Sequence, residues 1–313
     1  MTVQTPSRFD ERLALPGPLI LDGGLATQLE AQGYSLDSQL WSALLLRDDP
    51  RAIVDAHLAF FEAGAHCTIS ASYQATRSGL MTLGLSASEA QALIVKSVEL
   101  AVAAREEFLV AKPKTSGPLL VAASVGPYGA PLGDGSEYTG DYGVDDTALI
   151  EFHRERLSWL DHSGADLLAC ETIPSLQEAK VLQGLLMEVD SPAWVSFSCR
   201  DGTHLNDGTP IEVCARLFKG HPRVRAIGIN CTSPIYINEL IGEIKKVDPT
   251  QKVVVYPNSG EIYDASNNSW HGTSSPIECG EAAQTWRQSG ADIIGGCCRM
   301  GPEHIKSIKE TMR

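Results

Sequence analysis

The chain has 313 residues, of which 43% are hydrophobic and 20% are charged, so it can bury a large core. Its net charge of −14 argues against binding to nucleic acid or to an anionic membrane, and no apolar run approaches the roughly 18 residues that cross a bilayer. Because the first residues also lack a secretory signal, the eight cysteines are expected to be reduced thiols in the cytoplasm rather than a disulfide framework.

In chain order, residues 1–17 are expected to be a loose lead-in and residues 18–313 a single domain. From residue 18 onward, short apolar strands alternate with helical patterns. The predicted strands are 18–25, 66–73, 119–124, 166–171, 193–198, 226–231, 252–256 and 292–296. Helices are expected at 50–63, after the capping box of Ser86 and Glu89, and at about 147–163, 175–188, 210–219, 234–247 and 278–289.

One joint between helix and strand recurs along the chain. Gly64, Gly164 and Gly290 each follow a predicted helix and stand just before a strand. Glycine at this place is typical of a left-handed helix cap, so the joint indicates a repeated unit of helix and strand. Eight such strands predict an α/β fold of the (β/α)8 TIM-barrel type. A doubly wound open sheet is the alternative, but no Gly-x-Gly-x-x-Gly follows a strand.

Three cysteines stand at the carboxyl ends of predicted strands, which share one face in a barrel. Cys231 ends one strand, and the adjacent pair Cys297 and Cys298 ends the last. Three thiolates with an open fourth position are the ligand set of a catalytic zinc site. The alternatives are that Cys231 is a buried small hydrophobe and that the pair serves packing or forms a vicinal disulfide. The other five cysteines are expected to be structural.

Further polar residues fall on the same face. The candidates for binding a substrate are Asp22, Gly23, Ser70, Ser72, Glu171 and Asn230. Asp22 could instead hold the glycine turn that follows it, and Glu171 could instead cap a loop.

Two long loops are expected to open on this face. Residues 126–146 contain Tyr128, Tyr138, Tyr142 and five carboxylates, and residues 259–275 contain Trp270. Loops of this length are usually lids or binding loops, and aromatic rings beside carboxylates suit a cation. The alternative is a solvated loop with ordinary turn residues.

Zinc held by three thiolates is a poor Lewis acid for hydrolysis, but it can bind and ionise an incoming thiol. A fitting partner is a methyl group on a cationic sulfur or nitrogen. A metal-dependent hydrolase would need histidine and carboxylate ligands, and a non-catalytic zinc-binding protein would need no open position.

The segments Asp22-Gly-Gly, Gly228-Ile-Asn-Cys231 and Gly295-Gly-Cys-Cys-Arg299 resemble the signatures of the homocysteine S-methyltransferase family. The resemblance spans about residues 18–310. It implies zinc on Cys231, Cys297 and Cys298, and homocysteine as acceptor with its sulfur in the fourth position. It also implies that Glu171 meets the ammonium group of homocysteine and that backbone N–H groups near Gly23 meet the carboxylate, with Asp22 and Ser70 or Ser72 nearby.

The segment from Ser124 to Gly129, together with Asp134-Gly-Ser-Glu-Tyr138, most resembles the branch of the family that uses S-methylmethionine. Tyr128, Tyr138, Tyr142 and Trp270 are then expected on the donor side, with methionine as product. S-adenosylmethionine as a lesser donor, betaine as another donor and selenols as acceptors remain open. The absence of a cobalamin or folate module and of the C-terminal extension of the betaine enzymes leads us to expect a monomer.

Overall fold

The computed structural model describes residues 6–36, 41–260, 262–264, 269–271 and 275–312. Its main sheet has eight parallel strands in the order β1-β10-β7-β6-β5-β4-β3-β2. The strands are β1 (Leu19–Ile20), β2 (Cys67–Ile69), β3 (Leu120–Val125), β4 (Leu167–Ile173), β5 (Ala193–Phe197), β6 (Val224–Asn230), β7 (Lys252–Tyr256) and β10 (Ile293–Ile294). Each of the eight overlaps a segment predicted to be a strand, and β3, β4 and β6 extend one or two residues beyond it.

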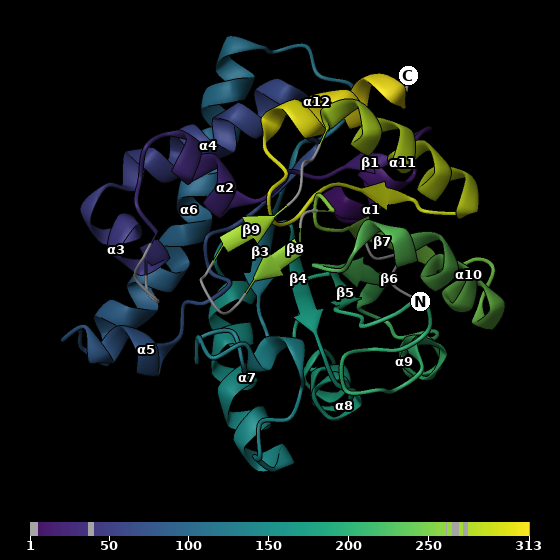
Figure 1. The fold of residues 1–313 in the computed structure, drawn as a ribbon. Coiled ribbons are helices and arrows are strands. Elements are labelled where there is room, and N and C mark those ends of the chain that lie inside the picture. Colours follow the sequence, from purple (N-terminus) through teal and green to yellow (C-terminus); the bar gives the residue numbers. More distant parts are fainter. Residues whose placement is uncertain (1–5, 37–40, 261, 265–268, 272–274, 313) are drawn as a thin grey trace.

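The sheet closes on itself, because its two outer strands also meet. Leu21, just after β1, forms a parallel bridge with Cys67 of β2, and the Asp22 N–H donates to the Cys67 carbonyl over 3.0 Å. The helices surround this ring of strands (Figure 1). The predicted (β/α)8 barrel is therefore confirmed, and the open-sheet alternative is wrong.

Every predicted helix is present. They are α4 (Pro50–Ala63), α6 (Ala87–Ala111), α7 (Asp146–Asp161), α8 (Leu176–Leu185), α9 (Ile211–Phe218), α10 (Ile237–Val247) and α11 (Pro276–Ser289). Further helices that the sequence patterns did not indicate are α2 (Leu25–Ala31), α3 (Trp41–Asp48), α5 (Arg77–Thr82) and α12 (Pro302–Thr311). Gly64, Gly164 and Gly290 have φ angles of 105°, 89° and 114°, so all three joints use the left-handed conformation expected of them.

Alternation along each strand divides the core into two layers. Leu120 and Ala122 of β3 belong to a cluster inside the barrel, together with Trp194. Val121, between them in the sequence, belongs to the larger cluster that includes apolar side chains of the surrounding helices. The strands are therefore buried on both faces, as parallel strands in barrels are.

The segment expected to be a loose lead-in contains a helix, α1 (Arg8–Leu13). Ser7 and Asp10 form a capping box at its start, and the side chain of Phe9 is fully buried in the cluster inside the barrel. The Phe9 and Trp194 ring centroids are 6.1 Å apart. Residues 8–13 thus pack against the barrel core, and the expectation of a loose segment is wrong for them.

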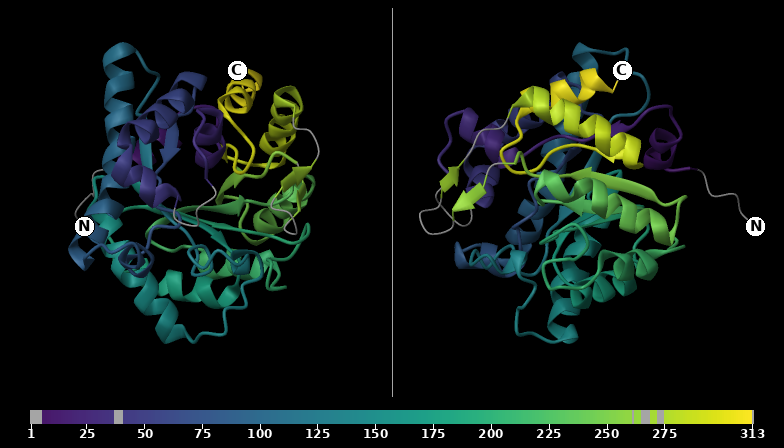
Figure 2. Two further views of the ribbon diagram at one scale, coloured as in Figure 1. Left: turned by 60° about the vertical axis from the view of Figure 1, so that its left-hand side comes forward. Right: turned by 45° about the vertical axis from the view of Figure 1, so that its right-hand side comes forward.

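The second predicted loop contains a hairpin of β8 (Ile262–Asp264) and β9 (Ser269–His271). This hairpin and α1 lie at opposite ends of the barrel (Figure 2). No helix among the described residues is long and apolar enough to cross a bilayer.

Candidate active site

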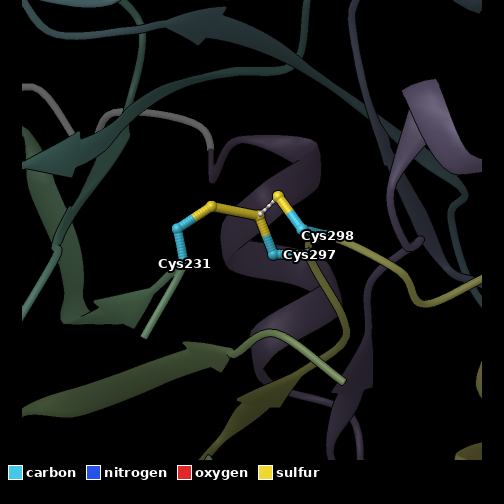
Figure 3. Close-up of side chains that lie close together, drawn as sticks. All are labelled: Cys231, Cys297 and Cys298. Carbon is cyan, nitrogen blue, oxygen red and sulfur yellow. Dashed lines mark hydrogen bonds between the residues drawn. A yellow bond between two sulfur atoms is a disulfide. The ribbon is translucent and has the colours of Figure 1, made fainter. Parts of the chain in front are cut away.

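The three cysteines predicted to come together do so. Their sulfur atoms all lie within 4.8 Å of one another. Cys231 follows β6 directly, while Cys297 and Cys298 follow the end of β10, and the three side chains point toward one another (Figure 3). Convergence of two strand ends that are distant in sequence produces the cluster, as expected for the carboxyl face of a barrel.

Two of these cysteines are bonded to each other. Cys231 and Cys297 form a disulfide with a Cα–Cα distance of 5.7 Å, and the Cys298 sulfur lies 4.0 Å from that of Cys297. The structure therefore differs from the expected reduced thiols, and also from the vicinal disulfide considered as the alternative. Cys231 and Cys297 can pair because their Cα separation is within the usual range for disulfides. The other five cysteines are buried and lie outside this cluster, as expected for structural residues.

The donor set fits a metal ion once the disulfide is reduced. Three thiolates form a soft set that suits zinc among the common biological metals. Among the described residues only these three ligands converge, which would leave one coordination position for a substrate. The disulfide and the metal would use the same two sulfur atoms, so the two states exclude each other.

Backbone hydrogen bonds hold the first and last signatures side by side. The Gly296 N–H donates to the Asp22 carbonyl over 3.0 Å, and the Gly24 N–H donates to the Met300 carbonyl over 2.9 Å. A side chain at Gly23 would run into the Met300 carbonyl oxygen. Glycine at this position thus lets the turn after β1 approach the cysteine-bearing segment closely.

Three non-glycine residues in the described part of the chain have a positive φ, and all three line one pocket. They are Thr172, Cys231 and Arg299, with φ angles of 63°, 46° and 66°. Such backbone costs of the order of 1–3 kcal/mol per residue and tends to occur at functional sites. Asn230 supports the first of them, because its amide accepts from the Thr172 N–H over 2.7 Å and donates to the Thr172 hydroxyl over 2.7 Å.

The pocket has a volume of about 330 Å³. Its lining includes all three cysteines, and predicted residues Gly23, Ser70, Glu171 and Asn230 contribute to the same lining. Ser72 does not line it, because its hydroxyl donates to the Ser124 carbonyl and lies 2.8 Å from the Ser70 hydroxyl.

Glu171 brings a buried carboxylate to the pocket. It lies within β4, is 7% exposed, and accepts a hydrogen bond from the Ser124 hydroxyl. Burial raises its pKa to about 7, although the hydrogen bonds from Ser124 and Tyr256 act in the opposite direction. A cation bound beside it would favour the ionised form.

Asp22 lies just behind the glycine turn. One of its oxygens accepts from the Thr68 hydroxyl over 2.7 Å and from the Ile69 N–H over 2.8 Å. The other oxygen is buried and has no partner among the described residues. Burial raises the pKa of Asp22 to about 7, and the charge of Glu171 adds to the shift. The Asp22 side chain therefore holds the adjacent strand β2, whereas the alternative had it holding the glycine turn, and it keeps one acceptor available.

The predicted donor-side residues separate into two groups. Tyr138 lines the pocket, whereas Tyr128 and Tyr142 do not. Those two rings pack on each other with centroids 5.2 Å apart, and the Tyr142 hydroxyl donates to the buried Glu178 over 2.9 Å. Trp270 lies in β9, and its side chain is outside the described part of the chain.

Several pocket residues were not singled out from the sequence. Tyr73, Glu137, Thr172, Tyr256 and Arg299 all line the pocket. Four of them lie at or just after the end of a strand or beside a named candidate. Including one or two more residues at each strand end among the candidates would therefore have found them. Glu137 could be named only as one of five carboxylates in its loop, because nothing in the sequence indicates which of these turns inward.

Comparison with known proteins gives consistent matches over almost the whole chain. Residues 19–312 match the family model described as Homocysteine S-methyltransferase. The homocysteine S-methyltransferase YbgG of Bacillus subtilis (strain 168) is 47% identical over 297 residues, with 93% of each chain covered. Crystal structures of the homocysteine methyltransferase MmuM from Escherichia coli in oxidized and metallated forms have TM-scores of 0.89 and 0.88 at 42% identity, covering 97% of this chain and 99% of that one. Its apo form, with the same coverage, has a TM-score of 0.78.

Proposed function

Because the chain belongs to the homocysteine S-methyltransferase family, we propose that it transfers a methyl group from a small cationic donor to homocysteine, giving methionine. The observation that carries this proposal is the convergence of three cysteine sulfurs in one pocket with the buried carboxylate of Glu171. The cluster suits the thiol end of an amino-thiol, and the carboxylate suits its ammonium end.

We propose zinc as the metal and Cys231, Cys297 and Cys298 as its ligands. When bound, zinc lowers the pKa of a coordinated thiol, so that homocysteine reacts as a thiolate at neutral pH. In the part of the chain that the structure describes, three protein sulfurs and no further ligand converge, which would leave a position for the substrate sulfur.

The amino-acid end of homocysteine would bind at the other side of the pocket. Glu171 would accept hydrogen bonds from the ammonium group, with the unpartnered oxygen of Asp22 close behind the pocket wall. The backbone at Gly23 would approach the carboxylate, and Ser70 would contribute its hydroxyl. Asn230 would act indirectly, by holding the strained backbone of Thr172.

We propose S-methylmethionine as the preferred donor, S-adenosylmethionine as a lesser one and betaine as a poor one. A sulfonium has no N–H or O–H to donate, so carboxylates and aromatic rings are what can hold it. The pocket supplies the rings of Tyr73 and Tyr138 beside its carboxylates. A selenol acceptor would fit the same chemistry and belongs in the substrate test.

We propose that the protein acts as a monomer, which is supported by the three cysteines and Glu171 lining one pocket of a single chain. We place the protein in the cytoplasm, where the three thiols would stay reduced.

The test combines metal analysis with a donor panel. Reduced protein purified with zinc should hold about one zinc per chain, and Cys231→Ala, Cys297→Ala and Cys298→Ala should each lose both zinc and activity. S-methylmethionine, S-adenosylmethionine, betaine and methylfolate are then compared at fixed homocysteine. Zinc binding without turnover of any donor would favour a non-catalytic zinc-binding barrel, and faster turnover of betaine would overturn the donor assignment.

A further inference from the structure

One carboxylate of the loop after β3 turns into the pocket. Residues 126–146 contain five carboxylates, but Glu137 alone of these lines the pocket, beside Tyr73, Tyr138 and Glu171. It is carried by the short helix η1 (Ser136–Tyr138). The loop therefore brings the Glu137 carboxylate into the pocket that holds the cysteine cluster, while its other four carboxylates do not line that pocket.

Close packing holds η1 in position. A Cβ at Gly129 would lie 2.5 Å from the Glu137 nitrogen and 2.7 Å from the Ser136 hydroxyl, so only glycine lets the two segments touch. The Ser136 N–H donates to the Asp134 side chain and the Gly140 N–H donates to the Ser136 carbonyl, each over 2.9 Å.

The rest of the loop is tied to α8. Glu178 is fully buried and accepts from the Tyr128 N–H over 2.6 Å and from the Tyr142 hydroxyl over 2.9 Å. It also lies 2.7 Å from the ring nitrogen of His153. The loop is thus anchored on both sides of η1, and these contacts hold η1 so that the Glu137 side chain faces the pocket.

One carboxylate oxygen of Glu137 has no hydrogen-bond partner among the described residues. This atom, Oε2, is buried. Burial raises the pKa of Glu137, and the charge of Asp134 adds to the shift. A buried acceptor without a partner is costly unless a ligand provides one.

Aromatic rings lie close to this carboxylate. Tyr138 is its neighbour in η1. The pKa of Tyr73 is raised by its burial first and then by neighbours that include Tyr138 and Glu137, so all three share one side of the pocket. Rings beside an unpartnered carboxylate form a site for a cation that cannot donate conventional hydrogen bonds.

We propose that Glu137 is the specificity-determining carboxylate of the donor subsite and pairs with the positive charge of a sulfonium donor. The inference rests on the proposed function and deepens it. In the transfer, the bond between the sulfonium sulfur and its methyl carbon breaks, and its electron pair stays on that sulfur. A lone pair of the homocysteine thiolate forms the new carbon–sulfur bond. The donor leaves as a neutral thioether, which no longer pairs with Glu137.

Loss of the charge during transfer predicts a distinctive kinetic signature. Glu137→Gln should raise KM for S-methylmethionine roughly tenfold or more, because the neutral amide cannot supply the attraction between opposite charges at close range. Because the pair forms with the bound donor and weakens as the charge disappears, kcat should change much less. At saturating homocysteine, the inhibition constant of methionine against S-methylmethionine should stay nearly unchanged, since the thioether is neutral.

A matched control removes the same charge from the same loop. Asp134→Asn leaves a side-chain oxygen that can still accept from the Ser136 N–H, and Asp134 does not line the pocket. This variant should keep the wild-type KM. Glu137→Asp, which retains the charge on a shorter side chain, should fall between wild type and Glu137→Gln.

Zinc content, homocysteine affinity and the thermal unfolding midpoint of each variant show whether the protein remains intact. An unchanged KM in Glu137→Gln, or an equal rise of KM and of the methionine inhibition constant, would overturn the assignment of Glu137 while leaving methyl transfer itself in place. Failure of the wild-type protein to methylate homocysteine with any cationic donor would instead contradict the proposed function.

Discussion

At the scale of single residues, the pocket places carboxylates where burial opposes their charge. Glu171 is 7% exposed, and burial raises its pKa from 4.5 to about 7. A raised pKa means that the folded protein favours the neutral acid more strongly than the unfolded chain does. Ionised Glu171 therefore lowers the stability of the ligand-free protein, and a bound ammonium group would offset that loss.

The pH dependence of stability tests this interpretation of Glu171. In the unfolded chain the carboxyl ionises near its ordinary pKa of 4.5, and in the folded protein near 7. Its favourable contribution is thus complete below about 4.5 and is lost as the pH rises through about 7. Glu171→Gln cannot ionise, so its unfolding free energy relative to wild type should increase between pH 4.5 and 8 by up to about 3 kcal/mol. Denaturant unfolding of the reduced, metal-free proteins measures the difference, with Glu62→Gln as an exposed control on α4. A difference that does not vary with pH would show that Glu171 is not perturbed by burial.

The same substitution tests recognition of the substrate. Glu171→Gln keeps the shape of the side chain but removes the charge that would meet the ammonium group. Homocysteine binding to the zinc-loaded protein should weaken by roughly 1.5–3 kcal/mol, the range for hydrogen bonds to charged groups. Calorimetric titration measures the affinity, and zinc content should match that of wild type. Normal binding would transfer the role to Asp22, whose free oxygen is the next candidate.

Single residues also show what the sequence could and could not predict about the site. The cysteine cluster could be predicted because strand ends meet on one face of a barrel whatever the details of packing. The positive φ angles of Thr172, Cys231 and Arg299 could not, since these residue types give no sign of left-handed backbone. The disulfide partner of Cys297 could not be predicted either, because pairing depends on Cα separation in the folded chain.

At the scale of elements, α1 is a helix that the sequence did not predict. A six-residue helix has too few apolar positions to show a clear period, so the segment read as a lead-in. Its largest apolar contact comes from Phe9, which is fully buried beside Trp194.

Replacement of Phe9 tests that contribution. Phe9→Ala would leave a cavity within the barrel and should lower the unfolding free energy by about 3–5 kcal/mol. Leu15→Ala, at an exposed position just after the helix, should change it far less. Denaturant unfolding measures both. Stability close to wild type in Phe9→Ala would mean that α1 only covers the barrel without supporting it.

For the loop of residues 126–146, the amino-acid composition does not predict which side chains face the pocket. Its tyrosines were expected to face the donor because aromatic rings and carboxylates occur together in the sequence. In the structure Tyr128 and Tyr142 anchor the loop to Glu178, and Tyr138 alone of the three reaches the pocket. The sequence indicates which residues the loop contains, but hydrogen bonds to a distant helix decide which of them turn inward.

Shortening this loop between Gly133 and Tyr142 removes η1 while leaving the cysteines and Glu171 in place. Turnover with S-methylmethionine should fall, because the donor would lose Glu137 and Tyr138, whereas zinc content and homocysteine affinity should remain nearly unchanged. Steady-state kinetics and calorimetry distinguish the two effects. An equal loss of homocysteine affinity would show that the loop supports the whole pocket rather than the donor subsite.

At the scale of the whole molecule, the barrel could be predicted because eight apolar strands, each followed by a helix or a long loop, have few ways to bury both faces. What the pattern did not show is how the ends of β6 and β10 are joined. Cys231 and Cys297 are 66 residues apart in sequence, and one covalent bond links the two ends. A metal ion held by the same sulfurs would link them as well, so the ends of β6 and β10 can be joined either by the disulfide or by a metal ion.

The reduced, metal-free protein has neither link, and we expect it to be the loosest of the three states. Hydrogen exchange in peptides covering residues 226–232 and 293–300 should therefore be fastest in the reduced, metal-free protein. Either link should raise the local opening free energy by about 2–4 kcal/mol, the usual range for a disulfide. Residues 193–197 of β5 serve as the internal reference, since neither link involves them.

Cys298→Ala separates the two links, because it retains the disulfide pair but lacks the third thiolate. When oxidised it should exchange like wild type, and when reduced it should gain little protection from zinc. Equal exchange in all three wild-type states would mean that hydrogen bonds such as those from Gly296 to Asp22 already hold the strand ends, and that the cysteines contribute chemistry without shaping the fold.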